Sequence, residues 1–228
     1  MSGIIAALGY NNVVPSLFQG LQRMPFEDGE YEGVTIATLM ERRIQQRHFF
    51  KPDFSTFLQK QTLTGCLNLA CIRQKQQSQK SQVHLVATEQ IAIASHGFID
   101  NIPEIREELL QLGYEVDSLC PSELILRFIC RYLDIEMSAR EASLIVFRRL
   151  KGEFAIIALF ALEESLIVAQ RGVPMMLGIK DNEVYIGSDI IALNYLVQPI
   201  MQIEENSLLI LRSFQNYPKS NLEIVQHI

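Results

Sequence analysis

The first eight residues constrain the fold of this chain more than any other stretch. Gly3 is followed by five apolar residues, Ile4 to Leu8, a composition typical of a strand buried on both faces. No basic run precedes these residues and no cleavage pattern follows them, so we expect them to stay in the mature protein. A chain whose first strand lies in its own core must hold its N-terminus at a defined position.

Ser2 gives this N-terminus a second interpretation. If Met1 is removed, Ser2 carries a hydroxyl and a free α-amine on one residue, and this amine titrates near about pH 8 in model peptides. The amine can accept the hydroxyl proton, so the residue forms a self-contained nucleophile and base. The plain alternative is a first strand with a small residue after Met1. These residues alone leave both interpretations open.

Composition and charge argue against several classes of protein. With 228 residues, 48% of them hydrophobic, the chain can bury a large core. Its net charge of −6 argues against a nucleic-acid partner, and no apolar run reaches the roughly 18 residues of a membrane span. We expect a cytoplasmic protein without a cofactor or a metal site, because its four cysteines form no C-x-x-C pair and suit free thiols in a reducing compartment: Cys66, Cys71, Cys120 and Cys130.

The predicted elements follow the order strands, helices, strands. After the first strand and a helix to about residue 24, strands are predicted between residues 34 and 94, helices between 105 and 150, and mainly strands from 154 onward. This order predicts an α+β fold, with helices packed on mainly antiparallel sheets rather than alternating βαβ units.

Helix signals support this order in the middle of the chain. Gly113 is placed to end a helix, Pro121 suits the first position of the next helix, and Ser138 with Glu141 matches a capping box for a third. Ser188 is expected to cap a short helix at residues 189–193.

Several other segments carry local predictions. The charged residues 41–48 predict a solvated face, and residues 53–60 predict a weak helix. The Gln-rich residues 73–82 predict an exposed loop or the tip of a hairpin. His96 and Gly97 follow a predicted strand. The histidine suits either a structural or a catalytic role, and the glycine permits a tight turn or close approach of a ligand.

Seven groups of residues along nearly the whole chain carry a resemblance: SGIIAA from Ser2, TG at Thr64, HGFIDN from His96, SELI from Ser122, LKGEFA from Leu150, GVP from Gly172 and IGSDIIAL from Ile186. In this order they resemble the glutaminase domain of glutamine:fructose-6-phosphate amidotransferase (glucosamine-6-phosphate synthase), a class II glutamine amidotransferase. The resemblance implies that residues 1–228 form a single glutaminase-like domain without the sugar-phosphate isomerase domain.

The resemblance also implies a fold and an activity. The fold is the four-layer αββα sandwich of N-terminal-nucleophile hydrolases, in which two antiparallel sheets pack face to face between helices. The activity is hydrolysis of the glutamine side-chain amide. In that family an N-terminal cysteine is the nucleophile and its own α-amine is the base.

The resemblance places different residues where the family carries its chemistry. Ser2 stands at the nucleophile position and His96 at that of the oxyanion-hole asparagine, whereas Gly97 is kept. The arginine that binds the glutamine α-carboxylate falls on Ala70, and the aspartate that receives the α-amino group falls on Pro121. Neither can make these contacts. Since losing one oxyanion donor typically costs about 2.7–4 kcal/mol, we predict that useful glutaminase activity is lost.

Three hypotheses follow. The leading one is a catalytically inactive glutaminase-like domain that acts as a binding or regulatory module. Its partner would be a separate synthase subunit, a second copy in a homodimer, or a small ligand such as glutamine or another amide. The alternative is an active amidohydrolase with Ser2 as nucleophile and with His96 and Gly97 lining the oxyanion pocket. The third is a glutaminase subunit that supplies ammonia to another polypeptide.

Overall fold

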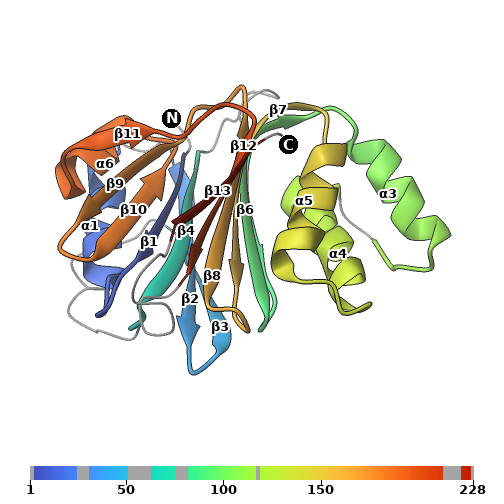
Figure 1. Cartoon of the computed structure of the whole chain (residues 1–228), viewed down its shortest axis with the longest axis horizontal. Helices are drawn as coiled ribbons and strands as arrows, with labels where there is room; N and C mark the ends of the chain where they lie inside the picture. Colours follow the sequence, from blue (N-terminus) through green and yellow to red (C-terminus); the bar gives the residue numbers. More distant parts are fainter. Residues whose placement is uncertain are drawn as a thin grey trace.

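The computed structural model describes residues 3–24, 31–50, 63–74, 82–116, 119–212 and 222–226. Within them two sheets lie face to face, and helices cover their outer faces (Figure 1). All strand pairs within the sheets are antiparallel. The predicted α+β fold is therefore confirmed, with its layers in the order helix, sheet, sheet, helix. Ser2, the helix predicted at 53–60 and most of the Gln-rich segment lie outside the described residues.

The first sheet has seven strands in the order β11-β9-β10-β1-β4-β2-β3. Strand β1 (Gly3–Leu8) lies in its middle and all six of its residues are buried, as its composition predicts. The other strands are β2 (Tyr31–Met40), β3 (Arg43–Phe50), β4 (Leu67–Gln74), β9 (Met176–Lys180), β10 (Glu183–Gly187) and β11 (Ile200–Gln202). Helices α1 (Val14–Arg23) and α6 (Ile190–Leu196) pack on the outer face.

The second sheet has six strands in the order β13-β12-β8-β7-β6-β5. They are β5 (Gln82–Ala87), β6 (Ile91–Ile99), β7 (Gly152–Phe160), β8 (Ser165–Arg171), β12 (Ser207–Arg212) and β13 (Leu222–Gln226). Its outer face is covered by α3 (Ile102–Gln111), α4 (Pro121–Leu133) and α5 (Ala139–Arg149), at the right of Figure 1.

The predicted helix signals are confirmed for the three helices of the second sheet. Gly113 has φ +84° directly after α3, and Pro121 begins α4. The capping box at α5 is formed, because Ser138 Oγ accepts from the Glu141 N–H at 3.2 Å and Glu141 Oε2 accepts from the Ser138 N–H at 3.1 Å. These local signals are read correctly because each depends on only three or four neighbouring residues.

Alternation along the strands divides the core into layers. On β1, Ile4 and Ala6 face the space between the sheets, whereas Ile5 and Ala7 face α1 and α6. On β4, Leu69 and Cys71 face the space between the sheets and Ala70 faces the helices. The period of two therefore decides which side chains reach the space between the sheets.

The solvated face predicted at residues 41–48 is confirmed, because all of these residues except Ile44 are exposed. Most of them belong to β3, which lies at the edge of the described sheet beside β2. One local prediction is wrong. Ser188 does not cap α6. Asp189 does, because its Oδ1 accepts from the Ile191 and Ala192 N–H groups at 3.0 and 2.9 Å. Ser188 instead contacts the first strand.

Candidate functional site

Three segments that are far apart in sequence meet at the start of β1. His96 Nδ1 of β6 lies 3.1 Å from Ser188 Oγ, in the segment between β10 and α6. Ser188 Oγ also accepts from the Ile4 N–H at 3.2 Å, and the Ser188 N–H donates to the Ile4 carbonyl at 3.0 Å. A Cβ on Gly3 would lie 3.6 Å from Ser188 Oγ. The structure thus places Ser188, which contacts His96, beside the residue that follows Ser2 in the chain.

His96 faces the space between the sheets. It alternates in phase with Ala92 and Ala94, which belong to the core between the sheets. Burial lowers the pKa of His96, which favours the neutral imidazole at neutral pH. A neutral imidazole has one N–H donor and one acceptor nitrogen, so the hydrogen bond at Nδ1 determines what the other nitrogen offers.

The backbone conformation at position 97 of β6 requires a glycine. Its φ is +111°, and a Cβ would lie 2.3 Å from the Glu153 carbonyl oxygen and 3.0 Å from the Phe154 Cα. Because β6 continues through Gly97 alongside β7, no other residue fits this close approach without a backbone shift. Gly97 therefore serves a close contact between strands rather than a tight turn. A ligand contact at Gly97 stays a prediction.

Ala70 and Pro121 occupy different surroundings from those of the histidine. Ala70 is fully buried in the core that faces α1 and α6, and it pairs with Ile5. Pro121 is the first residue of α4 and offers no side-chain hydrogen bond. The structure therefore places Ala70 on the opposite face of its sheet from His96, and Pro121 at a helix start.

Arg73 is a functional candidate that sequence reasoning missed. Gly3 pairs with Ile72, so Arg73 is the next residue on β4 beyond that pair, and alternation places it on the same face as Cys71. The side chain is partly buried. Burial raises the pKa of Cys71 to about 12, and the positive charge of Arg73 acts in the opposite direction there, as it does at Cys120. A guanidinium therefore lies near β4 and the start of α4.

The start of α4 is bound to the strand that carries His96. Ser122 Oγ donates to the His84 carbonyl at 2.9 Å and lies 2.7 Å from Ser95 Oγ, one residue before His96. Both serines are buried. This chain of contacts fixes the positions of Pro121 and His96 relative to one another.

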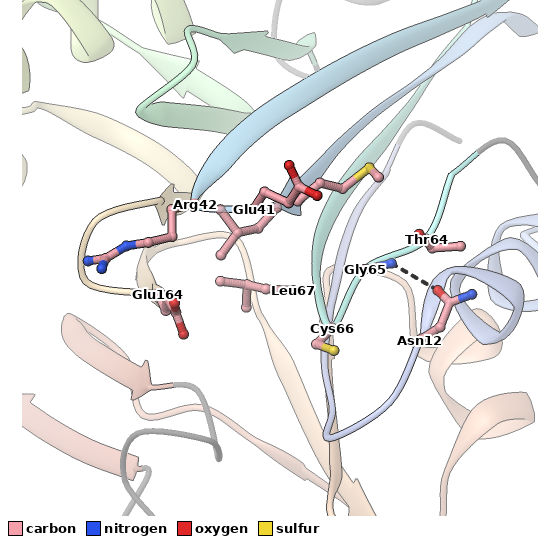
Figure 2. Close-up of a pocket in the computed structure, with 10 residues that line it drawn as sticks. Asn12, Glu41, Arg42, Thr64, Gly65, Cys66, Leu67 and Glu164 are labelled. Carbon is pink, nitrogen blue, oxygen red and sulfur yellow. Dashed lines mark hydrogen bonds between the residues drawn. The ribbon is translucent and has the colours of Figure 1, made fainter.

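A cavity of about 480 Å³ lies at the opposite end of β1 (Figure 2). Two of its polar side chains are bonded to the surrounding loops. Asn12 Oδ1 accepts from the Gly65 N–H at 3.0 Å (Figure 2). It also accepts from the Val14 N–H at 3.2 Å, and Arg42 Nη2 donates to the Leu162 carbonyl at 3.3 Å. None of the site residues predicted from the sequence lines it.

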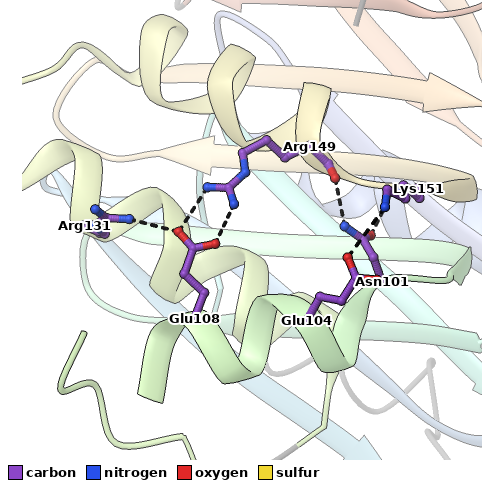
Figure 3. A network of polar contacts seen from close by, with 6 residues as sticks. All are labelled: Asn101, Glu104, Glu108, Arg131, Arg149 and Lys151. Carbon is purple, nitrogen blue, oxygen red and sulfur yellow. Dashed lines mark hydrogen bonds and ion pairs between the residues drawn. The ribbon is translucent and has the colours of Figure 1, made fainter. Parts of the chain in front are cut away.

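A polar network on the helix layer holds the far end of β6 (Figure 3). Glu108 of α3 is paired with Arg131 of α4 at 3.3 Å, and its other partner, Arg149 of α5, donates to it at 3.1 Å. These hydrogen bonds, chiefly that of Arg149, hold the pKa of Glu108 below its usual value. Asn101, just past β6, donates to the Arg149 carbonyl at 2.8 Å and accepts from the Lys151 N–H at 2.9 Å. The network anchors β6 to the helices.

No metal-ligand set is present in the described part of the chain, where no three His, Cys, Asp or Glu side chains are grouped. No described helix is long and apolar enough to cross a membrane.

Sequence comparison relates the chain to one family of domains. A family model described as "Glutamine amidotransferase domain" matches residues 68–195. The glutamine–fructose-6-phosphate aminotransferase (isomerizing) of Bartonella quintana (strain Toulouse) is 31% identical over 216 residues, which cover 92% of this chain and 35% of that protein. The chain thus spans about a third of the length of this curated relative.

Solved structures share the fold. Glutamine phosphoribosylpyrophosphate amidotransferase from B. subtilis matches with a TM-score of 0.79 and 15% identity, covering 98% of this chain and 49% of that one. A glutamine aminotransferase class-II domain protein from Silicibacter pomeroyi matches with a TM-score of 0.66 and 10% identity, covering 99% and 98% of the two chains. At these identities the matches show the fold alone.

Proposed function

Because the chain belongs to the glutamine amidotransferase domain family, of class II, we propose that it is a glutaminase-type module that binds a small amide or carboxylate ligand but does not hydrolyse glutamine at a useful rate. One observation carries the proposal. The framework around the start of β1 is intact, while the residues that meet there differ from those that the chemistry of the family needs.

The framework consists of backbone and hydroxyl contacts. Gly97 keeps the approach of β6 to β7, and Ser188 binds both backbone groups of Ile4. The start of β1 is therefore held in place next to His96. Groups held in fixed positions in this way suit ligand binding, because little ordering is needed when the ligand binds.

The residues at the positions where the family carries its chemistry support a loss of glutamine hydrolysis. Ser2 offers an alcohol where the family uses a thiol, and His96 stands where the family has an asparagine donor. Pro121 has no acceptor for an α-amino group. Losing one oxyanion-hole donor typically costs on the order of 10²–10³ in rate, and the changes at the nucleophile and amino-binding positions add to this loss.

Arg73 supports retention of ligand binding. The sequence resemblance put the carboxylate-binding position on Ala70, but Ala70 faces the helices and Arg73 faces the space between the sheets. A guanidinium is the side chain best suited to bind a carboxylate through two parallel hydrogen bonds. We therefore assign the anionic group of the ligand to Arg73.

A second candidate function is an active amidohydrolase with Ser2 as nucleophile. The observation that favours it is the same pair of groups: the imidazole of His96, whose pKa burial lowers, and the cation of Arg73 on β4. This mechanism requires the α-amine of Ser2 to be free, so it requires removal of Met1.

Measured glutamate release tests the two candidates. The full chain, its intact mass first determined, is incubated with millimolar glutamine beside a Ser2→Ala variant. The proposal expects no glutamate above the level of the variant. Release that depends on Ser2, in protein that lacks Met1, would establish the amidohydrolase instead.

Thermal shift against glutamine, glutamate and asparagine tests the binding part. A ligand at 100 times its dissociation constant adds about 2.7 kcal/mol to stability, which is a shift of several degrees for a chain of this size. A full chain that none of these compounds stabilises would contradict the ligand-binding proposal. The search for a partner would then turn to a synthase subunit or a second copy of the chain.

A further inference from the structure

A second cavity, of about 310 Å³, lies between the helix layer and the second sheet. Ile91 of β6 and Phe160 of β7 form its floor, because they pair with one another across the two strands and pack in the core under the helices. They are only 1% and 3% exposed. The walls come from the end of α4, the start of α5 and the turn between β7 and β8. The volume is at the small end of the range for ligand sites.

Most of the lining of this cavity is apolar. Leu133 ends α4, Met137 follows in the connection, and Ala139 begins α5. Leu162, in the turn after β7, is 64% exposed, so apolar surface of the cavity is open to solvent. Covering such surface with an apolar group is favourable because it removes the surface from water. The lining therefore favours a ligand with an apolar body.

Two carboxylates give this cavity its charge. Glu163 Oε1 accepts from the Ala139 N–H at 2.7 Å, whereas Glu163 Oε2 has no partner among the described residues. Asp134, the C-cap residue of α4, is exposed and its carboxylate has no ion pair with any described residue. No lysine, arginine or histidine is among the described residues that line the cavity. Arg42 donates to the Leu162 carbonyl but lines the cavity of Figure 2 instead.

We propose that this cavity is a second ligand site, which binds a small primary amine with an apolar body. Such an amine is protonated at neutral pH, as a lysine side chain is, and its ammonium group has three N–H donors and no acceptor. It suits the free oxygen of Glu163 and the carboxylate of Asp134, since hydrogen bonds between ionised groups are stronger than neutral ones. The apolar body then covers Ile91, Phe160 and Leu162.

The charge of the ligand distinguishes this site from the start of β1. There the proposed function assigns an anionic group to Arg73, whereas the carboxylates of the second cavity repel an anion. The two sites share no described residue, so neither proposal depends on the other.

Binding is tested by ¹H–¹⁵N correlation spectra of the ¹⁵N-labelled full chain at neutral pH, titrated with hexylamine. Hexanol and hexanoate are the matched ligands, because they keep the apolar body and replace the ammonium by a neutral and an anionic group. The expected result is saturable movement of the backbone amide signals of Gln90, Ala139 and Leu162 with hexylamine. Hexanol should bind roughly tenfold more weakly, and hexanoate should not bind.

Variants then test the two carboxylates. Glu163→Gln keeps an oxygen that can accept from the Ala139 N–H, and Asp134→Asn keeps the shape of its side chain. Each should raise the dissociation constant of hexylamine by roughly threefold to tenfold, because one charged partner is lost at a partly exposed site. Glu136→Gln is the matched control. It removes the same charge from an exposed residue near Asp134 that does not line the cavity, and it should leave binding unchanged.

Three results would overturn the proposal. They are no saturable shift with millimolar hexylamine, equal binding of hexylamine and hexanol, and equal weakening by Glu136→Gln and Asp134→Asn. Should Glu163→Gln fail to fold, Asp134→Asn and the three ligands still decide. Glutamine and its hydrolysis play no part in this experiment, so failure of the proposed function at the start of β1 would leave its result unchanged.

Discussion

The two ends of β1 differ in what their polar groups do. At the Leu8 end, Asn12 and the loops before β4 enclose the cavity of Figure 2, and their hydrogen bonds join loop to loop. At the Gly3 end, His96, Ser188 and Arg73 come from three different segments and include an imidazole and a guanidinium. The cavity has the volume of a small-molecule site, but its described polar contacts serve the scaffold.

This difference indicates that a meeting of reactive side chains from separate segments marks a functional site better than the volume of a cavity does. The Gly3 end combines an imidazole in contact with Ser188, the cation of Arg73 and a backbone held by Ser188. Groups with these properties are what a ligand with oxygen acceptors needs. Changes at the Gly3 end should therefore alter binding, whereas changes at the Leu8 end should alter stability alone.

The largest expected effect is that of Gly97→Ala. A Cβ would lie 2.3 Å from the Glu153 carbonyl oxygen at φ +111°, so we expect destabilisation of more than about 3 kcal/mol, or no folded protein. Gly113→Ala is the control, because its φ is also positive, at +84°, but no atom lies within 4 Å of the new Cβ. It should cost only about 1 kcal/mol. Equal unfolding free energies for the two variants in urea would contradict this account of Gly97.

The next effect concerns ligand affinity. Arg73→Met removes the cation that we assign to the carboxylate, and losing a hydrogen bond to a charged group costs about 1.5–3 kcal/mol. Titration calorimetry with the compound that stabilises the wild type most should then give roughly 10- to 100-fold weaker binding. Arg47→Met makes the same change of charge on the exposed face of β3 and should leave affinity unchanged. If both variants bind equally well, Arg73 does not contact the ligand.

A smaller effect is expected at the Leu8 end. Asn12→Ala removes the acceptor of the Val14 and Gly65 N–H groups, and each lost hydrogen bond costs about 1 kcal/mol. The melting temperature should fall by several degrees, while the dissociation constant of the ligand stays at its wild-type value. Asn11→Ala, an exposed neighbour, is the control and should melt like the wild type. Weaker ligand binding in Asn12→Ala would remove the distinction between the two ends.

Sequence reasoning predicted the framework better than the site. Composition and local signals suffice for β1, for Pro121 at the start of α4 and for the capping box at Ser138, because each depends on near neighbours. The partners of Ser188 are 184 and 92 residues away, so only the fold reveals them. Arg73 was missed because sequence analysis placed it in the Gln-rich loop of residues 73–82, whereas β4 extends to Gln74. Its face is known only from the pairing of β4 with β1.

The smallest effect is the pH dependence of stability at the Gly3 end. Because burial lowers the pKa of His96, the unfolded chain binds this proton more readily than the folded one. The stabilisation is complete above the unfolded value of about 6.5, is lost as the pH falls through it, and levels off below the folded value. His96→Gln cannot take up the proton. Urea unfolding at pH 7.5 and 5.5 should therefore show a smaller loss of stability in His96→Gln than in the wild type. An equal loss in both would mean that His96 titrates alike in the folded and unfolded chain, and the neutral imidazole would no longer distinguish this end of β1.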